Sequence, residues 1–170
     1  MACFSSDRPR SRKVILDRTD LRILELIQQD AKLSTVEISD RVGLSTTPCW
    51  RRLNNLDQQD TIIGRVALLN RGHLNLGVDA FVSIRTDQHN ERWFEAFAAA
   101  VAAFPEVIEL YRMSGEVDYL IHVVVPDIPA FDGFYKRLIR SVDLTDVSTS
   151  FAMERIKYTT ALPLHYADRG

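Results

Sequence analysis

Residues 34–53 have the sequence STVEISDRVGLSTTPCWRRL, which predicts two short helices on either side of a glycine turn. Ser34 and Glu37 have the spacing of a capping box, in which each side chain accepts a hydrogen bond from the backbone amide of the other residue. Gly43 can adopt the left-handed conformation that ends a helix. Pro48 falls in the first turn of the second helix, where an amide hydrogen would have no helical partner. The stretch therefore predicts a helix-turn-helix.

The second of these helices has one apolar and one polar face. Cys49, Leu53 and Leu56 recur at helical spacing on the apolar face. The opposite face is polar and basic, as it is in helices that enter the major groove of DNA. We predict DNA contacts from Ser45, Thr46, Thr47, Trp50, Arg51, Arg52, Asn54 and, beyond the helix, Arg65. The alternative is a solvated helix face that binds nothing.

The arginines of this set are predicted to act in two ways. Arg51 can pair with a guanine and thereby read sequence. Arg52 and Arg65 are expected to contact phosphates, which positions the protein without reading sequence. Asn54 can reach a base edge or a phosphate, and Trp50 can instead pack between the helix and the wing that is expected to follow it.

The neighbouring segments complete a winged domain over residues 14–70. Asp17 can cap a first helix, whose apolar residues Leu21, Leu24 and Ile27 recur at helical spacing. Residues 62–70 are predicted to form a short β-hairpin, the wing, with Gly64-Arg65 at or near its turn.

Charge is distributed unevenly along the chain. Residues 1–75 carry 12 lysines and arginines against 9 acidic residues, whereas residues 76–170 carry 9 against 14. A basic front half suits binding to nucleic acid. We interpret residues 1–13 as a flexible basic tail, and an arm that contacts DNA phosphate is the alternative.

Composition argues against several other classes of protein. No apolar run approaches the roughly 20 residues needed to span a bilayer, and the N-terminus lacks the apolar stretch of a secretory signal. Cys3 and Cys49 lie too far apart for a metal knuckle or a redox pair, and the histidines have no ligand spacing. We therefore predict a cytoplasmic protein without a membrane segment, a metal site or a cofactor.

The pattern of apolar residues changes after a predicted linker at residues 71–77. The expected elements are strand 78–84, helix 91–104, strands 107–113 and 118–125 joined by a hairpin turn, a helix after Pro126-Asp127, and strand 147–156. This α+β order is the ferredoxin-like βαββαβ arrangement, with two helices on one face of a four-stranded antiparallel sheet. We expect the open face of that sheet to be apolar enough to need a partner, which predicts a homodimer.

The combination of these two domains resembles the Lrp/AsnC (feast/famine) family of transcriptional regulators. The resemblance covers Ile15 to about Leu164, and its marks are LDRTD at 16–20, LSTTPCWRRL at 44–53, GRVALLN at 64–70 and MSGEVDYL at 113–120. The run FAMERIKYTT at 151–160 resembles the branch that responds to L-cysteine. The resemblance implies a DNA-binding regulator rather than an enzyme, assembled as homodimers and octamers. Residues 78–170 would then sense an amino-acid effector and mediate oligomerisation.

The resemblance also implies where the effector binds. In the family the hairpin near residue 115 helps to form a pocket between dimers, with the last strand nearby. A carboxylate such as Asp118 can hold the ammonium of an amino acid, and backbone amides at the Gly115 turn can hold its carboxylate. The predicted effector-binding residues are Arg112, Gly115, Glu116, Asp118, Ser150 and Phe151. The alternative for Asp118 is a structural role in capping or bridging the hairpin.

Two departures from the family pattern bear on these predictions. Many members have Asp-Gly where this chain has Asp60-Thr61, so either Asp60 takes the left-handed turn or the wing enters at a different angle. Glu116 stands where an aspartate is usual, which leaves the identity of the effector open.

Two further functions remain as alternatives. Sirohaem decarboxylases resemble the same two-domain layout, so an enzyme is possible on this fold. A ligand-binding module whose helix-turn-helix makes protein contacts is the other alternative.

Overall fold

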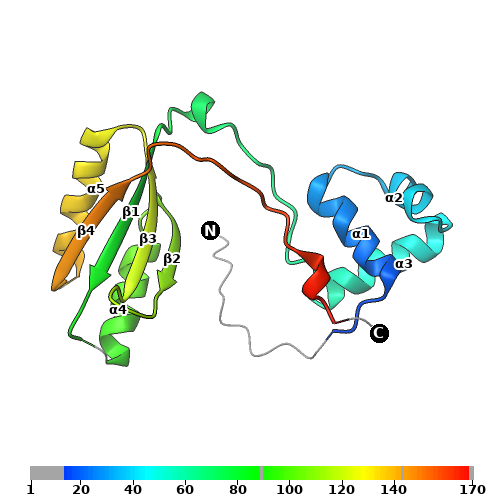
Figure 1. Cartoon of the computed structure of the whole chain (residues 1–170), viewed down its shortest axis with the longest axis horizontal. Coiled ribbons are helices and arrows are strands. Elements are labelled where there is room, and N and C mark those ends of the chain that lie inside the picture. Colours follow the sequence, from blue (N-terminus) through cyan, green and yellow to red (C-terminus); the bar gives the residue numbers. More distant parts are fainter. Residues whose placement is uncertain (1–13, 89, 143, 169–170) are drawn as a thin grey trace. The chain divides into compact units, whose positions relative to one another are not determined.

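The computed structural model describes residues 14–88, 90–142 and 144–168, so the predicted tail at residues 1–13 lies outside the described part of the chain. The chain forms two compact units (Figure 1). One contains the described residues up to Ala67 together with those from Tyr158 onward, and the other spans Leu68–Lys157.

Three helices build the first unit: α1 (Arg18–Gln29), α2 (Thr35–Val42) and α3 (Thr46–Gln58). Asp17 caps α1, and Ser34 and Glu37 form the predicted capping box at the start of α2. Gly43 ends α2 in the left-handed conformation, with a φ of 73°. The predicted helix-turn-helix is therefore confirmed.

The three helices share one apolar core. Ile23 of α1 and Cys49 of α3 are completely buried at its centre, and Ile38 of α2 is nearly so. The buried members of this cluster are Leu16, Ile23, Leu24, Ile38, Val42, Cys49, Leu53 and Leu56. Because α3 is held through its apolar face, its polar face is directed away from the helical unit.

The predicted wing hairpin is wrong for this structure. Residues 63–70 form no strand, and Ile63, Val66, Leu68 and Leu69 remain exposed. Two isolated strands without a third strand or a packed apolar face are only marginally stable in water, which explains why the alternating pattern alone did not produce a hairpin. Asp60 does take the left-handed turn that the sequence allowed, with a φ of 54°.

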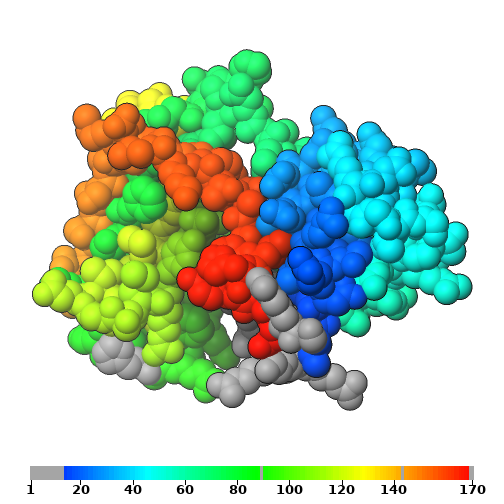
Figure 2. Space-filling view, turned by 45° about the vertical axis from the view of Figure 1, so that its right-hand side comes forward, coloured from blue at the N-terminus to red at the C-terminus, as the bar shows by residue number. Residues whose placement is uncertain are grey.

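The last described residues belong to the first unit and are hydrogen-bonded to its first helix and to the residues before it. The side-chain amide of Gln28 on α1 donates to the carbonyl of Leu162 at 3.1 Å and accepts from the amide of the same residue at 2.9 Å. The amide of Leu16 donates to the carbonyl of Asp168 at 3.2 Å. Figure 2 shows these last residues, in red, against the first helix, in dark blue.

Apolar packing holds the same C-terminal segment in place. Leu164, the first residue of the short helix η2 (Leu164–Tyr166), packs with Ala167 against the core of the three helices. Residues 78–170 were predicted to form one domain, whereas the contacts place the segment from Tyr158 onward with the helix-turn-helix. The predicted linker also contains a short helix, η1 (Arg71–Leu74).

The second unit is a four-stranded antiparallel sheet with two helices. Its elements are β1 (Val78–Arg85), α4 (Glu91–Ala102), β2 (Val107–Arg112), β3 (Tyr119–Val125), α5 (Ile128–Ser141) and β4 (Asp146–Phe151). The strand order β2-β3-β1-β4 confirms the predicted ferredoxin-like arrangement. The last strand was expected to reach residue 156 but ends at Phe151, which pairs with Ala80, close to the start of β1, so that little of β1 is left to pair with later residues.

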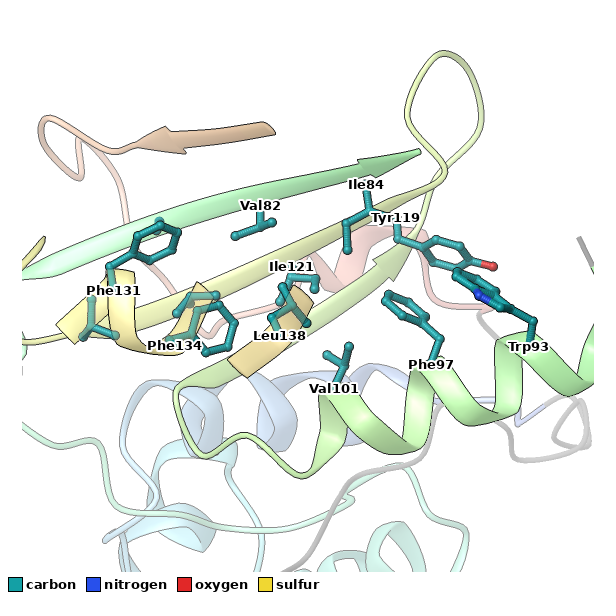
Figure 3. Packing of buried hydrophobic residues seen from close by; sticks show 13 residues of the cluster. Val82, Ile84, Trp93, Phe97, Val101, Tyr119, Ile121, Phe131, Phe134 and Leu138 are labelled. Atoms are coloured by element: carbon teal, nitrogen blue, oxygen red, sulfur yellow. The ribbon is translucent and has the colours of Figure 1, made fainter. Parts of the chain in front are cut away.

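Both helices pack their apolar sides on one face of this sheet (Figure 3). Phe97 and Val101 of α4 and Phe134 of α5 are completely buried against Val82 and Ile121 of the central strands. Trp93 stacks on Phe97 with 5.0 Å between the ring centroids. The alternation of buried residues along β1 follows the pleat of a half-buried strand.

The other face of the sheet was expected to be apolar but carries a charged network. Nε2 of His122 lies 2.7 Å from Oδ1 of Asp79, and its Nδ1 lies 3.1 Å from Oε2 of Glu109. Nη1 of Arg71 donates to the same Asp79 oxygen at 2.9 Å. Burial opposes ionisation of Asp79, but the hydrogen bonds from Arg71 and His122 outweigh it and hold the pKa of this carboxyl below its ordinary value.

Apolar side chains lie beside this charged network and cover only part of the open face. Phe81 stacks on the His122 ring at 4.5 Å, and Leu120 and Tyr111 pair across β3 and β2 on the same side. Side chains along a strand alternate between the two faces of a sheet, so Asp79 of β1 and His122 of β3 lie on the face that the helices do not cover. A face of mixed character, with a charged centre, therefore replaces the apolar one that was predicted.

Removing residues 158–170 should destabilise the helix-turn-helix. The core would lose Leu164 and Ala167, and the side-chain amide of Gln28 would lose its two hydrogen bonds to the backbone of Leu162. Together these losses correspond to about 1–3 kcal/mol in the free energy of unfolding. Thermal unfolding of the full-length and shortened chains measures the difference. Tyr166→Ala is the matched control, since this side chain is 81% exposed. Equal stability of the full-length and shortened chains would contradict the packing described above.

Candidate nucleic-acid interface and effector site

The exposed side of α3 carries most of the residues predicted to contact DNA. Successive residues of a helix are about 100° apart, so burial of Cys49 directs Thr47 and Arg51 to the opposite side. Asn54 lies at the edge of the same polar face and is half-buried. Gln58, seven residues after Arg51, extends this row of polar side chains and was missed by the sequence analysis. Its signal was the helical spacing of residues 47, 51, 54 and 58.

Several of these side chains have unused hydrogen-bonding groups. Within the described residues Arg51 makes no hydrogen bond or ion pair, and its side chain is exposed. Ser45 occupies the N-cap of α3, but its hydroxyl does not cap the helix. Trp50 is 55% exposed, so it does not take up the alternative of packing beneath the segment that follows α3. Thr46 is also exposed, in the first turn.

The two arginines predicted to contact phosphate have protein partners. Nη1 of Arg52 lies 2.6 Å from Oδ2 of Asp17 and 2.7 Å from Oδ1 of Asp20. Nη1 of Arg65 lies 3.3 Å from Oδ1 of Asp57, and both of these side chains are about two-fifths exposed. The Arg65 contact is a surface ion pair that contributes little and can be exchanged for another anion. Arg52 is held far more closely.

The predicted effector hairpin is a tight turn between β2 and β3. The amide of Met113 donates to the carbonyl of Asp118 at 2.8 Å, and Gly115 has a φ of 119°, which strongly favours glycine. Glu116 projects into solvent with 89% of its side chain exposed, and Nη2 of Arg85 lies 3.5 Å from its carboxylate.

Asp118 joins this hairpin to the end of β1. Its amide donates to the carbonyl of Ile84 at 3.0 Å, and its Oδ2 accepts from the amide of Thr86 at 2.8 Å. This is the bridging role that the sequence analysis left open as the alternative. The other carboxylate oxygen has no partner of its own among the described residues.

The six predicted effector residues form two separate groups within one chain. Arg112, Gly115, Glu116 and Asp118 lie by the Ile84 end of β1, whereas Ser150 pairs with Phe81 and Phe151 pairs with Ala80. Four residues of strand span about 13 Å, so the two groups lie at different places along β1. Phe151 also packs edge-on against Phe131 of α5, at 5.0 Å between the ring centroids.

The described part of the chain contains neither a candidate metal site nor a candidate membrane-spanning helix. Among residues 14–88, 90–142 and 144–168, no group of histidine, cysteine and acidic side chains is arranged to hold a metal ion. None of the helices there combines the length and the apolarity needed to cross a bilayer.

Comparison with known families matches both units. Residues 16–63 match a winged helix-turn-helix DNA-binding model, and residues 79–162 match the Lrp/AsnC ligand binding domain. A DNA-binding helix joined to a small-molecule-binding α+β domain defines a one-component regulator. The chain belongs to the Lrp/AsnC family of transcriptional regulators.

Relatives and solved structures agree with this assignment. The DNA-binding transcriptional activator DecR of Escherichia coli K12 is 48% identical over 151 residues, which cover 88% of this chain and 99% of that protein. An AsnC family regulator from Agrobacterium tumefaciens is 53% identical with a TM-score of 0.87, over 89% of this chain and 99% of that one. A Neisseria meningitidis transcriptional regulator, solved as an L-Met complex, is 38% identical with a TM-score of 0.84, over 89% and 98%. These relatives favour a regulator over the enzyme alternative.

Proposed function

We propose that this chain is a sequence-specific transcriptional regulator that inserts α3 into the major groove of its operator. The observation that carries the proposal is the row formed by Thr47, Arg51 and Gln58, which points away from the core while the opposite side of the same helix is buried. Arg51 would read a guanine, Asn54 a base edge, and Ser45, Thr46, Trp50 and Arg65 the flanking backbone. The regulator would act in the cytoplasm.

An amino acid is the proposed effector. The relative solved with L-Met supports this class of ligand, and the resemblance of residues 151–160 to the cysteine-responsive branch makes L-cysteine the first candidate. The spare oxygen of Asp118 and the backbone amides of the Gly115 turn suit an ammonium and a carboxylate. Ser150 and Phe151 lie farther along β1, and in the proposed pocket between dimers they would face the hairpin of another subunit.

A homodimer through the open face of the sheet is the proposed building block, and four dimers would form the octamer. Leu120, Tyr111 and Phe81 supply apolar area on this face. The charged pairs around His122 and Asp79 would fix how two copies align, because a partner must leave them paired or complete their hydrogen bonds.

Arg51→Ala should weaken binding to the operator far more than binding to unrelated DNA. Loss of a base-reading arginine corresponds to about 1–3 kcal/mol, whereas Arg65→Ala should weaken all sequences alike and flatten the salt dependence. Titrations of operator and random duplexes at two salt concentrations separate these effects. Arg140→Ala, on the exposed side of α5, is the matched control. Unchanged operator affinity of the Arg51 variant would remove α3 from the interface.

Asp118→Asn should abolish most of the response to the effector without unfolding the sheet. The asparagine oxygen can still accept from Thr86, but the charge-assisted bond to an ammonium is lost, worth about 1.5–3 kcal/mol. Calorimetry with L-cysteine, then leucine, methionine, lysine and proline, compares the variant with the wild type. Glu95→Gln, at an exposed position of α4 outside the predicted effector residues, is the control for a general charge effect. Equal affinities of the Asp118 variant and the wild type would place the ammonium elsewhere.

Leu120→Asp should separate the proposed dimer into monomers. It places an unpaired carboxylate on the open face next to Tyr111, its cross-strand neighbour on β2. Sedimentation velocity of the full chain gives the oligomeric state. Ile139→Asp, at a 44% exposed position of α5, should leave the dimer intact. A Leu120 variant that remains dimeric would show that another surface joins the subunits.

A further inference from the structure

Arg51 and Arg52 are consecutive on α3 but cannot serve the same partner. Their side chains leave the helix about 100° apart. Arg51 lies on the exposed face, whereas Arg52 lies beside the buried stripe, with a third of its side chain exposed. Arg52 is therefore turned toward α1, where two carboxylates meet its guanidinium.

Each of those carboxylates divides its two oxygens between two tasks. Oδ1 of Asp17 accepts from the amides of Thr19 and Asp20, both at 2.8 Å, and Oδ2 receives Arg52. Oδ2 of Asp20 accepts from the amide of Asp17 at 3.2 Å, and Oδ1 receives Arg52. The capping box of α1 thus orients both carboxylates, and it leaves one oxygen of each aimed at the same nitrogen of α3.

Electrostatics favours this arrangement over a phosphate contact by Arg52. Moving Arg52 away from α1 would leave two carboxylates without a cation beside them, and their charges would repel the phosphates of a bound DNA. The backbone amide of Asp20 lowers the pKa of Asp17, and the bond from Arg52 lowers it further, so the carboxylate is charged at neutral pH. The contact between Asp20 and Arg52 raises the pKa of the guanidinium in turn.

We propose that Arg52 is a positioning residue for DNA binding, which fixes the rotation of α3 against the N-terminus of α1 and does not contact DNA. This inference rests on the proposed function of α3. Loss of the Arg52 contacts would leave the core in place but allow α3 to turn about its apolar stripe. The polar face would then meet base edges in several orientations, and discrimination between operator and other DNA would fall.

Neutralising the two carboxylates distinguishes this role from a phosphate contact. The Asp17→Asn and Asp20→Asn double variant keeps a good N-cap residue and removes two negative charges near the DNA. If Arg52 positions α3, operator affinity of the folded protein falls about five- to tenfold, and adding Arg52→Gln causes little further loss. If Arg52 serves phosphate, the freed arginine and the lost negative charge make the double variant bind all DNA more tightly, which would overturn the proposal.

Salt titrations of Arg52 variants give a second, independent readout. Arg52→Gln should reduce the ratio of operator to random-duplex affinity while the slope of affinity against salt stays that of the wild type. Arg52→Lys retains the positive charge but lacks the planar guanidinium with its several donors. It should therefore give a ratio between those of Arg52→Gln and the wild type. If Arg52→Gln lowers the slope of log affinity against log salt concentration by about one, as for the loss of one phosphate contact, Arg52 contacts DNA and the proposal fails.

Two controls make failures of the different claims distinguishable. Thermal unfolding and stoichiometric titration with operator establish the folded, active fraction of each variant, so affinities refer to active protein only. Arg51→Gln is measured alongside. If it binds the operator like the wild type, the proposed role of α3 fails. If it is impaired while the double asparagine variant binds more tightly, only the positioning role of Arg52 fails.

Discussion

Burial of one side of α3 is the constraint on which the DNA-binding half of this protein depends. Cys49 is completely buried between the helices, and Leu53 and Leu56 continue the same stripe. Close packing leaves few rotations of the helix that keep all three inside. The side chains on the far side therefore point away from the core, and the row from Thr47 to Gln58 is exposed to solvent and available to a ligand.

Ion pairs fix the relative orientation of elements that apolar packing orients only approximately. In the helical unit, the capping box of α1 presents two carboxylate oxygens to Arg52, so that an element needed to start one helix also orients another. On the open face of the sheet, Asp79 serves His122 and Arg71 in the same manner. Such contacts stabilise modestly, but they favour one geometry over its neighbours, and both DNA recognition and symmetric assembly require that.

The features predictable from sequence were those encoded by nearby residues. The caps at Asp17 and Ser34, the glycine turn and the alternation along β1 each depend on a few neighbouring side chains, and the order of the predicted elements indicated the ferredoxin-like sheet. The errors arose from distant contacts. Nothing local showed that Leu164 would join the core of residues 16–56. The expected wing failed for the opposite reason, since its local pattern found no surface to pack on. The effector residues remain a prediction, because a site shared between subunits depends on contacts that one chain does not contain.

Photo-cross-linking from α3 to operator DNA tests the central claim most directly. A photoreactive amino acid would replace Thr47 in the full chain, at the start of the exposed row, and a second protein would carry it at Asp132 on α5. The account predicts a cross-link to bases within the operator from position 47, and none from position 132. A protein that protects the operator from cleavage yet gives no cross-link from position 47 would contradict the account.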